Sequence, residues 1–226
     1  MSNKNCVLIT GANRGIGLEL TRLYCEKGFE VVACCRKKSK DLILTSAVIV
    51  EGLDVTDVTT YNVLDTHLKS TQFDIIIHNA GLLQNETISN MNSFARNSIE
   101  KQLYTNALGP LYLTGYLHDY LKTHSKLVFI TSRMGSIEDN TSGQRYGYRM
   151  SKVALNMAAK SLSVDLKEKE ISVGIIHPGW VKTQMTGYSG YNDPDYVANQ
   201  IFIRIDDLNL ESSGNFFHAN GDILPW

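Results

Sequence analysis

Residues 6–17 read CVLITGANRGIG and carry the strongest indication of fold class in the chain. The apolar run 6–9 predicts a buried strand, and the amphipathic stretch 15–27 predicts a helix. Between them, a Gly-x-x-x-Gly-x-Gly spacing permits a tight turn and close backbone approach to a pyrophosphate, which the helix N-terminus would face with free N–H groups. A plain turn is the alternative, but the position directly after a strand favours a dinucleotide site. The candidate contacts are Gly11, Asn13, Arg14, Gly15, Ile16 and Gly17.

The alternation of apolar runs and amphipathic stretches continues along the chain. Further strands are predicted at 31–34, 47–50, 73–77, 126–130, 171–176 and, at an edge, 214–217. Further helices are predicted at 57–69, 93–122, 147–168 and 194–206, with a kink or break at Gly109-Pro110. Apolar runs without polar alternation indicate strands covered on both faces. We therefore predict one α/β domain over 1–226, a doubly wound, Rossmann-type parallel sheet of about seven strands with helices on both faces.

Composition argues against several classes of protein. The 226 residues carry a net charge of −1 and no basic run, which argues against nucleic-acid binding. No apolar stretch approaches the ~20 residues of a membrane span, and we expect a soluble, cytoplasmic protein. The six histidines are scattered and the cysteines lack Cys-x-x-Cys spacing, so we expect no metal site. Reduced, buried thiols are expected for the four cysteines, which are Cys6, Cys25, Cys34 and Cys35.

The end of the second predicted strand bears on the choice of dinucleotide. A carboxylate is usual there to hold the adenosine ribose 2′-hydroxyl, but residues 34–38 read CCRKK. Arg36, with Lys37 and Arg14, would instead neutralise a 2′-phosphate, which favours NADP(H); a solvated basic loop is the alternative. Asp54 and Val55 follow the third strand on the same side. Asp54 would accept from the adenine amino group or cap the next helix.

Tyr148 and Lys152 form the only Tyr-x-x-x-Lys in the chain. Residues four apart on a helix share one face. An ammonium beside a phenol favours the phenolate, so the pair would lower the pKa of Tyr148 and let its hydroxyl exchange a proton with a substrate. A tyrosine and a lysine on a solvated helix face are the alternative, so the weight of the pair depends on the rest of the chain.

Several motifs together resemble those of the short-chain dehydrogenase/reductases. They occur in the family's order over nearly the whole chain: the glycine turn from Thr10 to Gly17, Asn79-Ala80-Gly81, Asn106, Ser132, Tyr148-x-x-x-Lys152 and Pro178-Gly179. Residues 177–183 (HPGWVKT) and 221–226 (GDILPW) also resemble the sniffer-type carbonyl reductases and the C-factor-like bacterial proteins.

The resemblance implies a role for each matching residue. Tyr148 would be the general acid in carbonyl reduction, Lys152 would lower its pKa and hold the nicotinamide ribose, and Ser132 would hydrogen-bond the substrate carbonyl. Asn106 would hold a water that links Lys152 to solvent. The cofactor would also contact Asn79, Ala80, Gly81, Pro178, Gly179, Val181 and Thr183. The alternatives are that Ser132 caps the end of the fifth strand and that Asn106 is a polar group on a helix surface.

Two features depart from the family's common pattern. His78 stands where Asn-Asn-Ala-Gly would have its first asparagine, and the spacing from Ser132 to Tyr148 (148 − 132 = 16) is long. The longer loop affects the pocket entrance. His177 is expected to pack at the end of its strand. The tyrosines at 188, 191 and 196 either line a substrate lid or lie on the surface.

The motifs favour an NADPH-dependent carbonyl reductase or alcohol dehydrogenase acting on a small molecule. An NADP(H)-binding regulatory protein with little turnover is the alternative, and a lyase or epimerase ranks third. The resemblance also implies a homodimer or homotetramer, paired through the helices near 93–122 and 147–168. Their many apolar residues would form that contact or belong to the core: Leu103, Leu108, Leu113, Leu117, Val153, Leu155, Met157 and Leu162.

Overall fold

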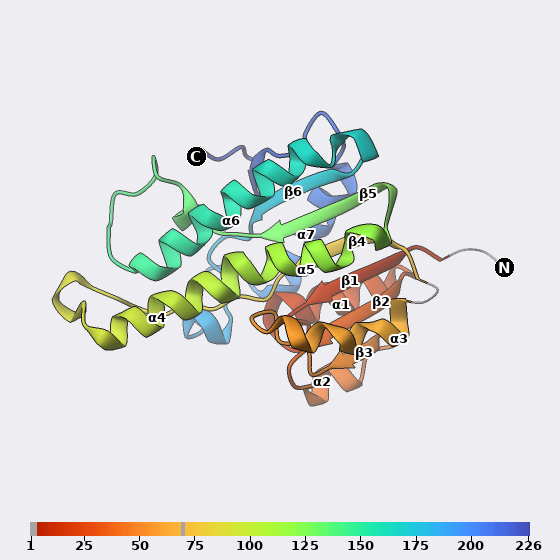
Figure 1. Cartoon of the computed structure of the whole chain (residues 1–226), viewed down its shortest axis with the longest axis horizontal. Helices are drawn as coiled ribbons and strands as arrows, with labels where there is room; N and C mark the ends of the chain where they lie inside the picture. The colour runs from red at the N-terminus through yellow and green to blue at the C-terminus, as the bar shows by residue number, and fades with distance from the viewer. Residues whose placement is uncertain (1–3, 69–70) are drawn as a thin grey trace.

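The computed structural model describes residues 4–68 and 71–226, and its centre is one parallel sheet (Figure 1). The strands are β1 (Cys6–Thr10), β2 (Glu30–Cys35), β3 (Val48–Glu51), β4 (Phe73–His78), β5 (Leu121–Ile130), β6 (Ser172–His177) and β7 (Phe216–His218). Their order in the sheet is β3-β2-β1-β4-β5-β6-β7, and every pair is parallel. The chain order reverses between β1 and β4, which confirms the predicted doubly wound fold.

Helices cover both faces of this sheet. They are α1 (Gly15–Glu26), α2 (Lys40–Ile43), α3 (Asp65–Leu68), α4 (Ser93–Leu103), α5 (Gly109–Leu117), α6 (Tyr146–Asp165) and α7 (Pro194–Asp207). Figure 1 shows α4 and α5 running end to end with α6 alongside them on one face, whereas α1 and α7 pack together on the other. Within the described ranges, no helix has the length and apolar character needed to cross a membrane.

Two apolar clusters, one on each face of the sheet, make up the core. Leu8 packs in the cluster beneath α5 and α6, and its neighbours Val7 and Ile9 pack in the cluster beneath α1 and α7. Cys34 and Cys35 divide in the same way. This arrangement explains why the strand sequences lack polar alternation, since successive side chains point to opposite faces and both faces are buried.

The predicted long helix at 93–122 is interrupted where its Gly-Pro pair suggested. Residues Tyr104–Leu108 form a π-helical turn between α4 and α5. Pro110 has no N–H to donate to the carbonyl of Asn106, four residues earlier, which explains the break. Only glycine fits at position 109, because a Cβ there would overlap the carbonyl oxygen of Val55. The helix also ends earlier than predicted, because residues 121 and 122 already belong to β5.

Other boundaries shift by a few residues. The helix predicted at 57–69 is a 3-10 helix (Val58–Leu64) followed by α3, and its last residue, Lys69, lies outside the described residues. β5 begins five residues early, and its pairing with β4 is irregular between Phe73 and Ile75. β7 begins at Phe216 rather than at 214. The short helix α2, which is capped by Ser39, was not predicted.

Candidate active site

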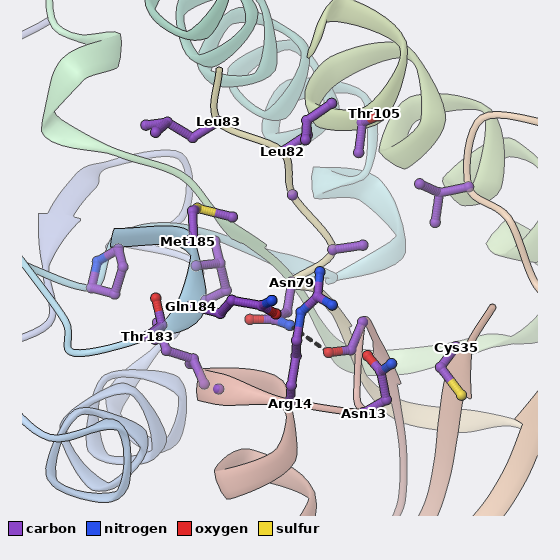
Figure 2. Close-up of a pocket in the computed structure, with 18 of the residues that line it drawn as sticks. Asn13, Arg14, Cys35, Asn79, Leu82, Leu83, Thr105, Thr183, Gln184 and Met185 are labelled. Atoms are coloured by element: carbon purple, nitrogen blue, oxygen red, sulfur yellow. Dashed lines mark hydrogen bonds between the residues drawn. The ribbon is translucent and has the colours of Figure 1, made fainter. Parts of the chain in front are cut away.

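A cavity of about 660 Å³ opens at the carboxyl ends of the strands, where β1 and β4 diverge. Figure 2 shows Asn13 and Arg14 from the glycine turn on one side and Thr183, Gln184 and Met185 on the other. Leu82, Leu83 and Thr105 close its far end, and Cys35 lies at the end of β2. Tyr148 and Lys152 also line it. The cavity therefore joins the predicted phosphate-binding turn to the predicted catalytic pair.

The glycine turn is held in a shape that only small residues allow. Gly11 and Gly15 have φ angles of +66° and +54°. A Cβ on Gly11 would lie 2.9 Å from Ala80 Cα, and one on Gly17 would overlap Gly11 O and Asn79 Nδ2. No side chain in the described part of the chain caps the start of α1. The first N–H groups of that helix can therefore meet an anion.

Asn79 and Ala80 fix the turn from the neighbouring strand. The backbone N–H groups of both residues donate to Thr10 Oγ1, at 3.0 and 3.1 Å. Asn79 Nδ2 donates to the carbonyl oxygens of Thr10 and Gly11, at 3.0 and 3.2 Å. These residues shape the site from behind, and Asn79, Ala80 and Gly81 also line the cavity.

The side of the cavity nearest β2 and β3 carries the residues predicted to choose the dinucleotide. Arg36 is largely exposed, and its Nη1 lies 3.8 Å from Asp54 Oδ2. Asp54 Oδ1 accepts from Thr56 N at 2.9 Å, so Asp54 caps a turn, whereas Asp57 caps the 3-10 helix that follows. Val55 lines the same wall. Asn13 Nδ2 donates to the backbone carbonyl of Lys37 at 2.9 Å, which joins the glycine turn to the basic loop.

Tyr148 and Lys152 line the other end of the cavity, and Ser132 lies next to Tyr148 but does not itself line it. Tyr148 lies in the first turn of α6, and Lys152 lies one turn later; both are buried. Ser132 hydrogen-bonds the side chain of Tyr148, and its Oγ also accepts from Met134 N at 3.1 Å, so it caps the turn after β5 as well. Lys152 Nζ donates to the carbonyl of Ile130 at 2.9 Å and lies 5.8 Å from the centre of the Tyr148 ring.

The ionisation of the pair differs from the sequence-based expectation. Burial raises the pKa of Tyr148 above its ordinary value, and the Ser132 hydrogen bond and the charge of Arg145 oppose that rise. Burial also lowers the pKa of Lys152 to about 7. The pKa of Tyr148 is therefore raised rather than lowered, and Lys152 is not among the groups that shift it. Lys152 Nζ donates to a backbone carbonyl instead, and its role as the group that lowers the pKa of Tyr148 stays a prediction.

Asn106 lies in the π-helical turn and is fully buried, so the surface alternative is wrong. Its Nδ2 donates to Leu82 O at 2.7 Å and to Ser151 Oγ at 2.9 Å, and its Oδ1 accepts from Leu82 N at 2.7 Å. The side chain therefore fixes the cavity wall at Leu82. Its proposed water link to Lys152 stays a prediction.

The residues after β6 contribute unequally. Pro178 and Thr183 line the cavity, and Thr183 packs so near Gly15 that a Cβ on the glycine would lie 3.3 Å from Thr183 Cγ2. Val181 instead packs its side chain in the core and does not line the cavity. Gly179 has a φ of +87° and lies against His218.

Neither His78 nor His177 lines the cavity. His78 is buried, stacks on Phe129 and pairs with Thr114 Oγ1 at 2.9 Å; burial lowers its pKa to about 3. His177 packs edge-on against His218, and burial is the main cause of its pKa of about 3. Both are therefore neutral packing residues, as expected for His177. Across the described ranges, no three His, Cys, Asp or Glu side chains are grouped to hold a metal.

Sequence reasoning missed Glu86, a buried carboxylate behind the catalytic helix. Its Oε1 accepts from Ser98 Oγ and from Gln102 Nε2, the latter at 2.6 Å, and its Oε2 accepts from Gly147 N at 3.2 Å. The carboxylate thus joins α4 to the first turn of α6, one residue before Tyr148. Glu86 lies in an irregular stretch with no motif, so the sequence offered no signal for it.

Tyr188, Tyr191 and Tyr196 are all exposed on the surface, and of the three only Tyr188 is a lining residue of the described cavity. The expectation of surface aromatics is therefore met, and a lid formed by these residues stays a prediction. Leu82, Leu83 and Met185 add apolar wall at the catalytic end. Periodicity gave no indication of these contacts, because the residues lie outside regular helices and strands.

Comparison with known proteins identifies the family. The model of the short chain dehydrogenase family matches residues 5–193. The chain belongs to the short-chain dehydrogenase family. It is 34% identical over 226 residues to 1-hydroxy-2-glutathionyl-2-methyl-3-butene dehydrogenase of Rhodococcus sp. strain AD45, covering 97% of this chain and 99% of that protein. It is 38% identical over 164 residues to the C-signal of Myxococcus xanthus, covering 71% of this chain and 97% of that protein.

Solved structures of carbonyl reductases share the whole fold. The carbonyl reductase Sniffer of D. melanogaster is 30% identical with a TM-score of 0.89, and the match covers 99% of this chain and 100% of that one. An NADPH-bound carbonyl reductase from chicken fatty liver is 29% identical with a TM-score of 0.87, covering 99% of each chain. Both resemblances predicted from the motifs, to sniffer-type reductases and to C-factor-like proteins, are therefore confirmed. This short-chain dehydrogenase is a member of an oxidoreductase family.

Proposed function

We propose that this short-chain dehydrogenase is an NADPH-dependent carbonyl reductase, or an alcohol dehydrogenase in the reverse direction. One observation carries the proposal. Tyr148 and Lys152 line one end of a cavity, Ser132 lies against Tyr148, and the other end of the cavity is a glycine turn shaped for a pyrophosphate. A dinucleotide fits there because the glycines leave backbone exposed where any Cβ would intrude.

The residues at the adenosine side support NADP(H) over NAD(H). Cys35 occupies the end of β2, where a carboxylate would hold the ribose 2′-hydroxyl, and Asn13 lies between Cys35 and Arg14, whose side chain extends into the cavity (Figure 2). Arg36 is exposed nearby, and its contact with Asp54 is long, so its guanidinium is free to bind a 2′-phosphate. Calorimetric titration should give a much tighter dissociation constant for NADPH than for NADH. Comparable constants would contradict this assignment.

The side chains supply the proton and hold the carbonyl. The bound dinucleotide provides the hydride. Tyr148 donates its phenolic proton to the carbonyl oxygen, and the Ser132 hydroxyl stabilises the charge that develops there. Burial keeps Tyr148 protonated at neutral pH, which suits a donor in the reducing direction. Lys152, with a pKa of about 7, is placed to hold the nicotinamide ribose or to return a proton.

Replacing Tyr148 with Phe tests the acid role. The variant removes one hydroxyl and leaves the ring in place, so turnover of aldehydes, ketones and quinones should fall by several orders of magnitude while NADPH affinity stays close to wild type. The measurements are steady-state kinetics and calorimetry. Substantial residual turnover would rule out Tyr148 as the proton donor.

An NADP(H)-binding signalling protein with little turnover is the second candidate. The 38% identity to a protein named C-signal favours it. The complete Ser132, Tyr148 and Lys152 set argues for catalysis, since a pure sensor needs no proton donor at the reacting end. Tight NADPH binding with no activity on the whole substrate panel would favour the signalling role.

We also propose that the chain forms a homodimer or homotetramer through α4, α5 and α6. Of the apolar residues named for this contact, Leu113, Leu117 and Leu155 belong to the core, but Met157 is exposed. Further exposed apolar side chains on these helices and the turn between them support the contact: Phe94, Tyr104, Tyr112, Met150 and Val164. Sedimentation of a monomer at working concentrations would exclude it.

A further inference from the structure

An unusual turn precedes the helix that carries Tyr148. Gly143, Gln144 and Arg145 have φ angles of +63°, +55° and +51°, so three successive residues are left-handed, two of them not glycine. Such conformations persist only where the surroundings impose them, and they concentrate at ligand sites. The turn connects the loop after Ser132 to the first residue of α6.

Hydrogen bonds hold the turn from both sides. Arg149 Nε donates to the carbonyls of Gly143 and Gln144, at 3.1 and 3.2 Å, and its Nη2 donates to Ser142 Oγ at 2.8 Å. On the other side, Arg145 N donates to the carbonyl of the buried Glu86 at 2.8 Å. The backbone of Arg145 is therefore fixed three residues before Tyr148.

The side chain of Arg145 turns toward the catalytic groups. Its Nη1 lies 3.9 Å from Met134 Sδ, and the N–H of Met134 donates to Ser132 Oγ. The charge of Arg145 also acts on the phenol of Tyr148. Among the described residues, no carboxylate lies within 4.0 Å of its guanidinium, whereas the neighbouring Arg133 pairs with Asp139.

The cavity has an apolar wall near Tyr148, and Arg145 lies beside that cavity without being one of the residues that line it. Leu83, Met185 and Tyr188 form this wall. The acidic residues that line the described cavity, Glu19 and Asp54, belong to α1 and to the loop after β3, on the side of the glycine turn. The half-buried guanidinium of Arg145 thus has an unmet capacity for two parallel hydrogen bonds, which a carboxylate matches.

We propose that Arg145 is an anion subsite that selects carbonyl substrates with an apolar body and a carboxylate. This specificity rests on the proposed carbonyl reduction. The carboxylate would pair with Arg145, the body would pack on the apolar wall, and the carbonyl would meet Ser132 and Tyr148.

Matched substrates and variants test the subsite. Formylbenzoate and formylphenylpropanoate, each paired with its methyl ester, are assayed with NADPH on wild type, Arg145→Gln, Arg145→Lys and the control Arg133→Gln. Wild type should prefer each acid to its ester. Arg145→Gln should lower kcat/KM for the acids by about 10- to 100-fold, the loss of a charge-assisted pair, and leave the esters nearly unchanged. Arg145→Lys should recover part of the loss, and Arg133→Gln should change neither class.

The acid-to-ester ratio separates recognition from other effects. A change in the pKa of Tyr148, or a less ordered turn at residues 143–145, would change kcat/KM for the acids and the esters together. The acid-to-ester ratio would then stay the same. An Arg145→Gln variant whose ratio equals that of wild type overturns the subsite, as does a wild type that prefers the esters.

Binding of formylbenzoate to the NADP⁺-loaded protein, measured by calorimetry, is a readout independent of turnover, because the oxidised cofactor has no hydride to transfer. If the wild type reduces none of these compounds, the proposed reaction fails for them. Weaker binding to Arg145→Gln would still support the subsite, and unchanged binding would still refute it.

Discussion

Glu86→Gln is expected to destabilise the protein although it preserves shape and size. The carboxylate accepts hydrogen bonds from Ser98, Gln102 and Gly147, and an amide must replace one oxygen by an NH₂ donor. Facing Gly147 N–H, that donor leaves a backbone N–H unpaired. If the new NH₂ group faces Gln102 instead, two NH₂ donors meet. The Gln102 amide cannot flip to present its oxygen without losing the hydrogen bond that Gln102 Oε1 accepts from Gln84 N at 2.9 Å.

Either placement leaves a buried donor without an acceptor, which costs about 1–3 kcal/mol of the free energy of unfolding. For a chain of this length, that loss lowers Tm by roughly 2–4 °C per kcal/mol. Urea unfolding followed by circular dichroism measures it as a lower midpoint at unchanged slope.

The control is Glu100→Gln on α4, the helix that carries Ser98 and Gln102, where the Glu100 side chain is 49% exposed and pairs with Arg96. It should change stability by less than about 0.5 kcal/mol. A Glu86→Gln variant no less stable than this control would refute the reasoning.

Two further predictions concern the glycine turn and the buried lysine. Gly17→Ala should abolish or strongly weaken NADPH binding in calorimetry, because its Cβ overlaps Gly11 O and Asn79 Nδ2, whereas Gly115→Ala, with nothing within 4 Å, should bind normally. Since burial lowers the pKa of Lys152 to about 7, the unfolded chain binds more protons than the folded chain between pH 7 and about 10. Wild type should therefore gain roughly 2–4 kcal/mol of stability relative to Lys152→Met as pH rises through that window; a gap that does not change with pH would contradict it.

The parts of the molecule that follow from local chemistry could be predicted from the sequence. The apolar runs predicted the position of every strand of the sheet. Both faces of the sheet are buried, so successive residues of a strand are apolar and form a continuous run. The glycine turn and the Tyr148–Lys152 pair were also readable, since short spacing determines them. Gly109-Pro110 located the interruption of the long helix, although its π-helical form depends on packing against Val55.

Features that depend on contacts between residues far apart in the sequence could not be predicted from it. The role of Glu86 depends on hydrogen-bond partners that lie 12 to 61 residues away in the sequence. Arg145 adopts a left-handed conformation that ordinary preferences assign to glycine or asparagine, so its sequence gave no sign of the turn. The pKa of Tyr148 was predicted in the wrong direction because burial, which spacing does not reveal, outweighs the neighbouring charge.

The placement of Cys34 and Cys35 on opposite faces of the sheet gives the protein two built-in reporters of local opening. All four cysteines are free thiols; Cys25 is half-buried, whereas Cys34 and Cys35 are buried, and burial raises the pKa of both. A thiol reagent should therefore label Cys25 readily in the native state and label Cys34 and Cys35 slowly, because both of these thiols are buried although they border the cavity. Because one thiol belongs to the α5–α6 side and the other to the α1–α7 side, their labelling rates with the cavity occupied would show which half of the molecule opens first.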